Sequence, residues 1–403
     1  MTPFRIIADE NIPCVEKAFG EFGTIERRPG RDIGPEAVSE ADLLLVRSVT
    51  PVTPPLLDES PVQFVGSATI GTDHVDEAYL REQGIAFAHA PASNADSVAD
   101  YVVAALLCLA HRRGVSLRNQ TVGVVGCGNI GGRLLRRLPA LGLTVLPHDP
   151  PRAATESGPQ VPDFVSLDRV LDRADILTLH VPLTTDGPHP TRHLVDEAVL
   201  DRLGPEAWLL NTARGPVVDG DALLEALQHD RLGGAVLDVW EHEPTPDPAL
   251  VRAVDLATPH IAGYAWDGKV RGTTMLYEAF CEHVGRDPTW SPAAVLRPQH
   301  PASLRCAPPD PRLSRVDWLH HLVRQAYDLG ADDARMRALL DPAPSEQGAY
   351  FQRLRATYPT RRELRCFSVP EAGLPTGRRA AVTGGLTVQG RAPGRHGNRI
   401  LKS

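Results

Sequence analysis

The stretch that decides the fold is TVGVVGCGNIGGRLLRRLPALGLTVLPHD, residues 121–149. It opens with a short apolar run, Thr121–Val125, which is typical of a buried strand. A glycine-rich turn follows, then a helical pattern at Arg133–Leu141, then a second apolar run at Thr144–Pro147. A strand, a glycine turn, a helix and a second strand in this order predict a doubly wound α/β domain with a parallel sheet.

The turn has the G-x-G-x-x-G pattern and consists of Gly126, Cys127, Gly128, Asn129, Ile130 and Gly131. The first glycine permits a tight turn, the second lets the backbone approach a pyrophosphate, and the third lets helix and strand pack closely. The start of the helix then offers free N–H groups to the phosphates. Glycine turns also occur as purely structural features, but this one lies between a strand and a helix. We therefore expect a Rossmann domain that binds a dinucleotide through this turn.

Asp149 follows the second strand, 23 positions after Gly126. A carboxylate at about this spacing accepts hydrogen bonds from the adenosine ribose hydroxyls. The same charge repels a 2′-phosphate, so NAD is favoured over NADP. Arg152 is the one nearby residue that suits a 2′-phosphate, and a place on the surface explains it better. The expected cofactor is NAD.

Short apolar strands alternate with helical patterns on both sides of this unit. The stretch Ser97–His111 is apolar nearly all round and predicts a buried helix, and Val15–Phe22 predicts another. Strands are expected before the glycine turn at Phe4–Ala8, Leu43–Arg47, Gln63–Ser67 and Ile85–His89, and after it at Ile176–Leu179, Trp208–Asn211, Gly234–Asp238 and Leu256–Ala257. Strands separated by helix-length connections predict parallel sheets.

Length and composition set limits on the function. A chain of 403 residues suggests two or three domains, and a formal charge of −8 disfavours nucleic acid and anionic membranes as partners. No run of about 18 apolar residues occurs, and the first residues lack the pattern of a secretion signal. Six cysteines without any C-x-x-C pair favour free thiols over zinc or disulfides. We expect a cytoplasmic protein without a metal.

The domain boundaries follow from changes in composition. We expect a smaller, flavodoxin-like substrate-binding domain from 1–95 and 258–286, around an NAD-binding domain at 96–257. A proline-rich linker is expected at 287–312, because proline sustains neither a helix nor a central strand. A small third segment follows at 313–370, with helical patterns at Trp318–Leu329 and Tyr350–Tyr358. Residues 371–403 are rich in glycine and arginine, and from Leu374 onward they predict disorder.

Three ionisable residues, Arg214, Glu243 and His260, directly follow predicted strands of the NAD-binding domain. Ligands of doubly wound sheets bind beyond the carboxyl ends of the strands, so these three side chains can converge on a nicotinamide. Singly, each has a plain structural explanation as a surface or loop residue. Their order and their position after a dinucleotide motif favour a shared site. His74, His89, His148 and His180 are interpreted as structural or surface residues.

This set suits hydride transfer at a 2-hydroxy acid. The histidine can accept the hydroxyl proton near neutral pH, because its ordinary pKa is about 6.5. The glutamate can stabilise the imidazolium and fix its tautomer. The arginine can hold the substrate carboxylate in a bidentate fork, which a lysine cannot match.

The motifs resemble the D-2-hydroxyacid dehydrogenase family, from about Asp9 to Gly285. Those that carry the resemblance are the glycine turn, N-x-x-R-G at Asn211–Gly215, L-D-V-W-E-x-E-P at Leu237–Pro244 and T-P-H-I-A-G at Thr258–Gly263. Further motifs, such as Ala8–Pro13, Val46–Thr50 and Gly71–Asp76, resemble a branch that oxidises a phosphorylated 2-hydroxy acid. The third segment is similar to the dimerisation domain of that branch, which extends the resemblance to about Val369 and implies a homodimer.

The resemblance implies that Arg214, Glu243 and His260 are catalytic, with His260 as the general acid/base. It implies cofactor contacts, in addition to those of the glycine turn, from Asp149, Val181, Ala213, Asp238 and Gly263, and substrate contacts from Ser48, Thr69 and Tyr264. Arg47 is added on chemical grounds, because a guanidinium beside Ser48 suits a substrate phosphate; a surface arginine is an equal alternative.

Two positions depart from the family pattern: Val181 replaces a threonine, and Gly330 replaces an arginine of the third segment. Two other functions stay open. One is a different D-2-hydroxyacid dehydrogenase, such as one acting on 3-phosphoglycerate. The other is an NAD-sensing binding protein without catalytic activity. In the preferred interpretation, substrate lies between the nucleotide domain and the split domain.

Overall fold

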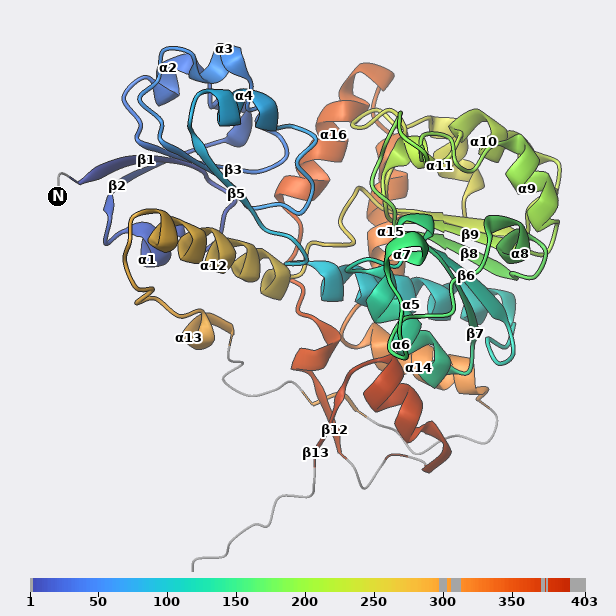
Figure 1. Cartoon of the computed structure of the whole chain (residues 1–403). Helices are drawn as coiled ribbons and strands as arrows, with labels where there is room; N and C mark the ends of the chain where they lie inside the picture. Colours follow the sequence, from blue (N-terminus) through green and yellow to red (C-terminus); the bar gives the residue numbers. More distant parts are fainter. Residues whose placement is uncertain (1–2, 297–302, 306–312, 371–373, 375, 392–403) are drawn as a thin grey trace, which may run out of the picture. The chain divides into compact units, whose positions relative to one another are not determined.

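A computed structural model of the chain describes residues 3–296, 303–305, 313–370, 374 and 376–391 (Figure 1). Its internal contacts divide it into two compact units. The first unit comprises Met1–Ser97 and Gly263–Arg297, and the second comprises Val98–Ala262 and Pro298–Ser403. Among the described helices, none combines the length and the apolar character that a membrane span requires.

The first unit contains a five-stranded parallel sheet in the order β2-β1-β3-β4-β5. With its strands numbered along the chain, this is the 2-1-3-4-5 order of flavodoxin-like sheets, as expected for the smaller domain. The strands are β1 (Phe4–Asp9), β2 (Gly23–Arg28), β3 (Leu43–Val46), β4 (Phe64–Ser67) and β5 (Ala86–His89).

Both faces of this sheet are buried under helices. Alternate residues of β3 point to opposite faces: Leu43 and Leu45 join one apolar cluster, and Leu44 joins the other. The helices on the first face are α1 (Val15–Phe19) and α12 (Trp266–His283). Those on the second are α2 (Pro35–Val38), α3 (Pro54–Leu57) and α4 (Glu77–Glu82). Strand β2 is not among the predicted strands, because GTIERR is a largely polar sequence that suits only an edge position.

The second unit contains a six-stranded parallel sheet in the order β11-β10-β9-β8-β6-β7. Its strands are β6 (Thr121–Val125), β7 (Thr144–His148), β8 (Ile176–Leu179), β9 (Trp208–Asn211), β10 (Gly234–Leu237) and β11 (Leu256–Ala257). Strand β6 lies between β7 and β8, so the winding of the chain reverses beside it. Such a switch point is where nucleotides bind in doubly wound sheets, and the glycine turn directly follows β6.

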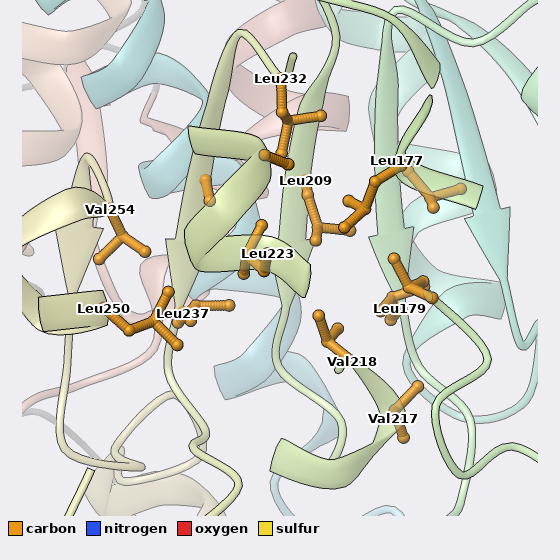
Figure 2. Close-up of a cluster of buried hydrophobic side chains, with 14 of the residues drawn as sticks. Leu177, Leu179, Leu209, Val217, Val218, Leu223, Leu232, Leu237, Leu250 and Val254 are labelled. Carbon is orange, nitrogen blue, oxygen red and sulfur yellow. The ribbon is translucent and has the colours of Figure 1, made fainter. Parts of the chain in front are cut away.

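One core of the second unit lies between the sheet and the helices that cross over it (Figure 2). Leu177, Leu209 and Leu237 reach it from neighbouring strands, and Leu223 and Leu250 reach it from helices. The helices that contribute are α8 (Leu167–Leu171), α9 (Glu197–Leu203), α10 (Gly220–Gln228) and α11 (Pro248–Ala253). Helix α6 (Gly131–Leu141) packs against β6 and β7, and α5 (Ala95–Arg113) is almost fully buried, as expected from its sequence.

The third segment packs into the second unit. Its helices are α14 (Arg315–Arg324), α15 (Leu329–Arg337) and α16 (Pro344–Ala356). Met336, Leu339 and Phe351 are completely buried and belong to the same core as Leu209 and Leu223. An ion pair of 2.7 Å between the buried side chains of Arg137 and Asp100 joins α6 to α5 within the same unit.

The expectation of disorder after Leu374 is wrong for residues 376–391. They form a short helical turn (Thr376–Arg378), a π-helical turn (Ala381–Gly385) and β13 (Gln389–Arg391), which pairs in parallel with β12 (Ser368–Pro370). The reason is a small apolar group that composition alone hides, consisting of Ala381, Val382, Leu386 and Val388, all of them buried. Residues 371–373, 375 and 392–403 of the predicted tail lie outside the described residues, as do 297–302 and 306–312 of the proline-rich linker.

The packing of the third segment predicts a large effect of Phe351→Ala. Phe351 is fully buried, so the change removes an aromatic ring from a core and leaves a cavity. We expect urea unfolding to show a loss of about 3–5 kcal/mol. Leu313→Ala is the control, since Leu313 is 36% exposed and should change stability by less than about 0.5 kcal/mol. Equal small effects would contradict a core shared with this segment.

Candidate active site

Three catalytic candidates follow three adjacent strands of the second unit. Arg214 lies after β9, Glu243 after β10 and His260 after β11. Because the strands are parallel, all three residues lie at the carboxyl edge of one sheet. This is the edge at which the glycine turn follows β6, and it is where the sequence predicted a shared site.

His260 and Glu243 form a hydrogen-bonded pair. Nδ1 of His260 lies 2.8 Å from Oε2 of Glu243, and the other carboxylate oxygen accepts a hydrogen bond of 3.0 Å from the backbone N–H of Trp240. The His260 side chain is 35% exposed and that of Glu243 is 23% exposed. With Nδ1 engaged, Nε2 is the ring nitrogen left for a ligand. The pair therefore has the geometry of a carboxylate-oriented acid/base.

Electrostatics keep Glu243 ionised. Burial alone would raise the pKa of this carboxyl, whereas the charge and hydrogen bond of His260 lower it. Arg355 and the Trp240 N–H act in the same direction, so the pKa of Glu243 lies below its ordinary value. An ionised carboxylate at this position is what stabilises a protonated imidazole.

The loop that carries His260 is held by Asp238. His260 has a positive φ of 57°, which is uncommon for a residue with a side chain. Its N–H donates to the Asp238 carbonyl at 2.7 Å, and the N–H groups of Ile261 and Ala262 donate to the Asp238 carboxylate at 2.8 and 2.9 Å. The Thr258 hydroxyl donates to the same carboxylate at 2.7 Å. Asp238 is only 1% exposed, and burial raises its pKa.

Arg214 lies in a loop that is fixed at both ends. The Asn211 side chain accepts from the N–H of Ala213 at 3.0 Å and donates to the carbonyl of Arg214 at 2.9 Å. A Cβ at Gly215 would lie 1.9 Å from the Trp240 carbonyl oxygen, so only glycine lets this loop pass the next one so closely. The Arg214 loop and the Trp240–Glu243 loop are therefore packed together.

The glycine turn meets the requirements expected from its sequence. Gly126 has a φ of 84°, and a Cβ there would lie 2.7 Å from the His180 backbone. A Cβ at Gly131 would lie 2.1 Å from the Gly126 carbonyl oxygen, whereas Gly128 has open space around it. The first and third glycines thus permit close packing, and the second leaves room for a pyrophosphate to approach the backbone.

Asp149 caps helix α7 (Pro150–Thr155) and receives the backbone N–H of Cys127 at 2.8 Å. The Arg152 guanidinium already has partners within the protein. It donates to the Cys127 carbonyl and forms an ion pair of 2.7 Å with Glu156. An arginine already paired with a carboxylate is poorly suited to a 2′-phosphate. The residues around this edge therefore fit NAD better than NADP.

Two other predicted cofactor positions flank the sheet edge, the half-buried Val181 and the buried Ala213. His180, just before Val181, bonds to the hydroxyls of Thr178 at 2.9 Å and Thr212 at 3.3 Å. Burial lowers the pKa of His180 to about 3, so this imidazole stays neutral near pH 7. This agrees with its interpretation as a structural histidine.

The predicted substrate residues belong to the first unit. Arg47 is partly buried and lies after β3, where its Nε is 3.4 Å from the fully buried carboxylate of Asp9. Ser48 is exposed beside it. Thr69 follows β4, and its hydroxyl oxygen lies 2.7 Å from the hydroxyl oxygen of Ser67. Arg47, Ser48 and Thr69 therefore share the carboxyl edge of adjacent strands.

The two remaining candidates of the first unit lie before α12. The ring of Tyr264 contacts the Lys269 ammonium, 4.4 Å from the ring centroid. A Cβ at Gly263 would lie 2.2 Å from the Asn94 side chain, so glycine is required for this close approach. Neither contact identifies a ligand, and both assignments stay predictions.

The residues that hold the loops of the candidate site are not recognisable from the sequence. Asn211 and Trp240 lay inside recognised motifs, yet their roles depend on contacts between loops. Tyr101, on α5, lies 2.6 Å from the Thr258 hydroxyl and extends the Asp238 network. Nothing local marks Tyr101, because in the sequence it is one more large residue of a buried helix.

Comparison with known proteins identifies the family of the chain. Residues 94–262 match the family model of the D-isomer specific 2-hydroxyacid dehydrogenase NAD binding domain, and residues 311–376 match a domain of unknown function, DUF3410. An erythronate-4-phosphate dehydrogenase of Salinibacter ruber is 60% identical over 96% of this chain and 100% of its own length. Another, from Pseudomonas syringae pv. tomato, is 47% identical over 89% of this chain and 93% of its own.

Solved structures show the same fold. The TT0316 protein of Thermus thermophilus has a TM-score of 0.61 and 27% identity, covering 71% of this chain and 98% of its own. A D-lactate dehydrogenase of Aquifex aeolicus, solved with NAD and lactic acid, has a TM-score of 0.58 and 25% identity, covering 70% and 95%. The chain therefore belongs to the erythronate-4-phosphate dehydrogenase family and is an NAD-dependent dehydrogenase of the D-isomer specific 2-hydroxyacid type.

Proposed function

We propose that this enzyme oxidises 4-phospho-D-erythronate at C2 to (R)-3-hydroxy-2-oxo-4-phosphooxybutanoate, a step of vitamin B6 biosynthesis. The hydrogen bond of 2.8 Å between His260 and Glu243 carries the proposal, because it supplies the oriented base that oxidation of an alcohol needs. The substrate follows the name of the relative that is 60% identical over nearly the full chain.

In the proposed reaction, Nε2 of His260 takes the proton of the C2 hydroxyl. The bond between C2 and its hydrogen breaks at the same time, and a carbonyl forms at C2. Bound NAD supplies the acceptor for the hydride. Glu243, ionised before the reaction, stabilises the imidazolium that results. In the reverse direction His260 returns the proton.

Arg214 is proposed to bind the substrate carboxylate through two parallel N–H donors. The packing of its loop against the Trp240–Glu243 loop supports this role, since it limits how far the guanidinium can move relative to the acid/base pair. For the phosphate, the proposal assigns Arg47 and Ser48, with Thr69 and Tyr264 as further substrate contacts. The pairing of Arg47 with Asp9 leaves other guanidinium N–H groups for an anion.

For the cofactor, the proposal assigns the glycine turn to the diphosphate and Asp149 to the adenosine ribose. The open space at Gly128 supports the first assignment. Val181, Ala213, Asp238 and Gly263 are proposed to line the rest of the dinucleotide. The carboxylate of Asp238 is taken up by loop N–H groups, so its contribution is to fix the Thr258–Ala262 backbone. We further propose a cytoplasmic homodimer.

Turnover of two phosphorylated acids tests the substrate. We expect NADH to appear faster with 4-phospho-D-erythronate than with 3-phosphoglycerate, both with and without an added 2-oxo acid that could reoxidise the cofactor in place. Faster oxidation of 3-phosphoglycerate would assign the enzyme to another branch. Tight NAD binding with no detectable oxidation of any hydroxy acid would favour an NAD-sensing protein.

Glu243→Gln tests the acid/base pair. The amide oxygen can still accept the hydrogen bond from His260, but the amide NH2 cannot accept the N–H of Trp240, and the charge that stabilises the imidazolium is lost. We expect kcat to fall about 10-fold or more, less than in His260→Ala, where the loss should reach about 10²-fold. NAD affinity, measured by fluorescence titration, should stay nearly unchanged. Glu241→Gln, in the same loop, is the matched control, because Glu241 pairs with His193 instead. Normal activity of Glu243→Gln would remove the carboxylate from the mechanism.

Arg214→Lys tests the carboxylate grip. Lysine keeps the charge but cannot form a planar two-point contact, so kcat/KM for the hydroxy acid should fall by about 10²-fold. Steady-state kinetics with saturating NAD measures this effect. Arg202→Lys, at an exposed site that pairs with Asp168 and Asp172, should behave as wild type. Near-normal kinetics in Arg214→Lys would contradict the proposed contact.

A further inference from the structure

Two residues of the third segment contact the backbone of residues 257–262, which comprise the end of β11 and the loop that carries His260. Ahead of His260, the Asp333 carboxylate accepts the N–H of Ala257 at 2.9 Å. Beyond His260, the Arg361 guanidinium donates to the carbonyls of Ala262 at 2.5 Å and Ile261 at 3.3 Å. The loop is thus held on both sides of the histidine by charged groups that are distant in sequence.

Both charged groups are buried, with Asp333 5% and Arg361 6% exposed. The Arg361 guanidinium also lies over the ring of Tyr327, with 4.1 Å between the guanidinium carbon and the ring centroid. Asp333 receives Arg337 at 3.0 Å and Arg112 at 3.2 Å. Hydrogen bonds from charged groups are strong in such surroundings, and each of these groups is itself held in place.

The contacts complete those made by Asp238. Asp238 binds the N–H groups of Ile261 and Ala262, and Arg361 binds the carbonyl oxygens of the same two residues. His260, with a φ of 57°, needs surroundings that fix this conformation, because a residue with a side chain rarely adopts such a backbone. A small turn of the loop would move Nε2 away from the substrate hydroxyl.

We propose that the third segment, residues 313–370, positions the catalytic histidine through Asp333 and Arg361. Both are positioning residues, since they contact the loop backbone and act through His260. The inference rests on the proposed function of His260 as the acid/base. The region matched by the DUF3410 model would then help to position the acid/base of the same chain, in addition to any role in assembly.

Arg361→Met tests the proposal in the full-length protein, with hydrogen exchange of a peptide spanning 257–262 as the first measurement. Loss of the guanidinium should speed exchange of the Ile261 and Ala262 amides about 10-fold or more, because the loop opens more readily. The second measurement is steady-state kinetics. kcat should fall about 10-fold, whereas KM for the hydroxy acid and NAD affinity should stay within about two-fold, since displacement of a catalytic group affects the chemical step. Arg361→Lys, which keeps a donor, should recover part of both losses.

Arg137→Met is the matched control. Arg137 is as buried as Arg361, at 5% exposed, and it pairs with Asp100 and donates to the Gly385 carbonyl at 2.9 Å. Its loss should lower thermal stability by a similar amount and leave exchange of the 257–262 peptide and kcat near wild-type values. If Arg361→Met lowers only thermal stability and otherwise matches this control, the proposal is wrong.

The exchange measurement separates this inference from the proposed function. If the wild type does not oxidise 4-phospho-D-erythronate, the proposed substrate is wrong, and faster loop exchange in Arg361→Met still supports the positioning role. If Arg361→Met does not fold, Arg361→Lys and Asp333→Asn are measured in the same way. Unchanged exchange in both variants would overturn the proposal.

Discussion

The site depends on one buried carboxylate, that of Asp238 at the end of β10. It is 1% exposed and accepts hydrogen bonds from Thr258, Ile261 and Ala262, which lie on either side of His260. A buried carboxylate is costly unless such donors surround it. If the loop moved away, the Asp238 carboxylate would lose these hydrogen bonds and be left unpaired. This constraint keeps His260 at an uncommon positive φ and presents its ring to Glu243. The acid/base pair is therefore a consequence of how the loop after β11 is tied to the end of the neighbouring strand.

Much of the fold could be predicted because both sheets are parallel and buried on both faces. Strand Leu43–Val46 is a continuous apolar run, and Ile176–Leu179 is apolar except for Thr178, so the sequence displays both directly. Edge strand β2 and the π-helical turn at Ala381–Gly385 could not be recognised, because their polar or glycine-rich sequences acquire order only from their neighbours. Local pattern identifies central elements, whereas peripheral ones need knowledge of what they pack against.

The same division applies to the site. Arg214, Glu243, His260 and the glycine turn were predictable, because each lies directly after a strand and parallel strands bring their ends together. The residues that hold these groups were not. Glycine is required at position 215 because the Trp240 carbonyl leaves no room for a side chain. Tyr101 contacts the Thr258 hydroxyl although the two residues are 157 positions apart in the sequence. The side chains that would carry the chemistry lie in recognisable motifs. The residues that hold them in place are determined by packing and hydrogen bonds between distant parts of the chain.

The third segment shows why such supports matter for function. If it served only to join subunits, its buried charges could be replaced by apolar side chains, which often stabilise a protein as well as an ion pair does. Asp333 and Arg361 are instead directed at backbone N–H and carbonyl groups of 257–262, which apolar residues cannot satisfy. Those groups belong to the loop whose conformation sets the position of the imidazole. Two buried charged residues at this place are therefore better explained by their effect on the geometry of His260 than by their contribution to stability.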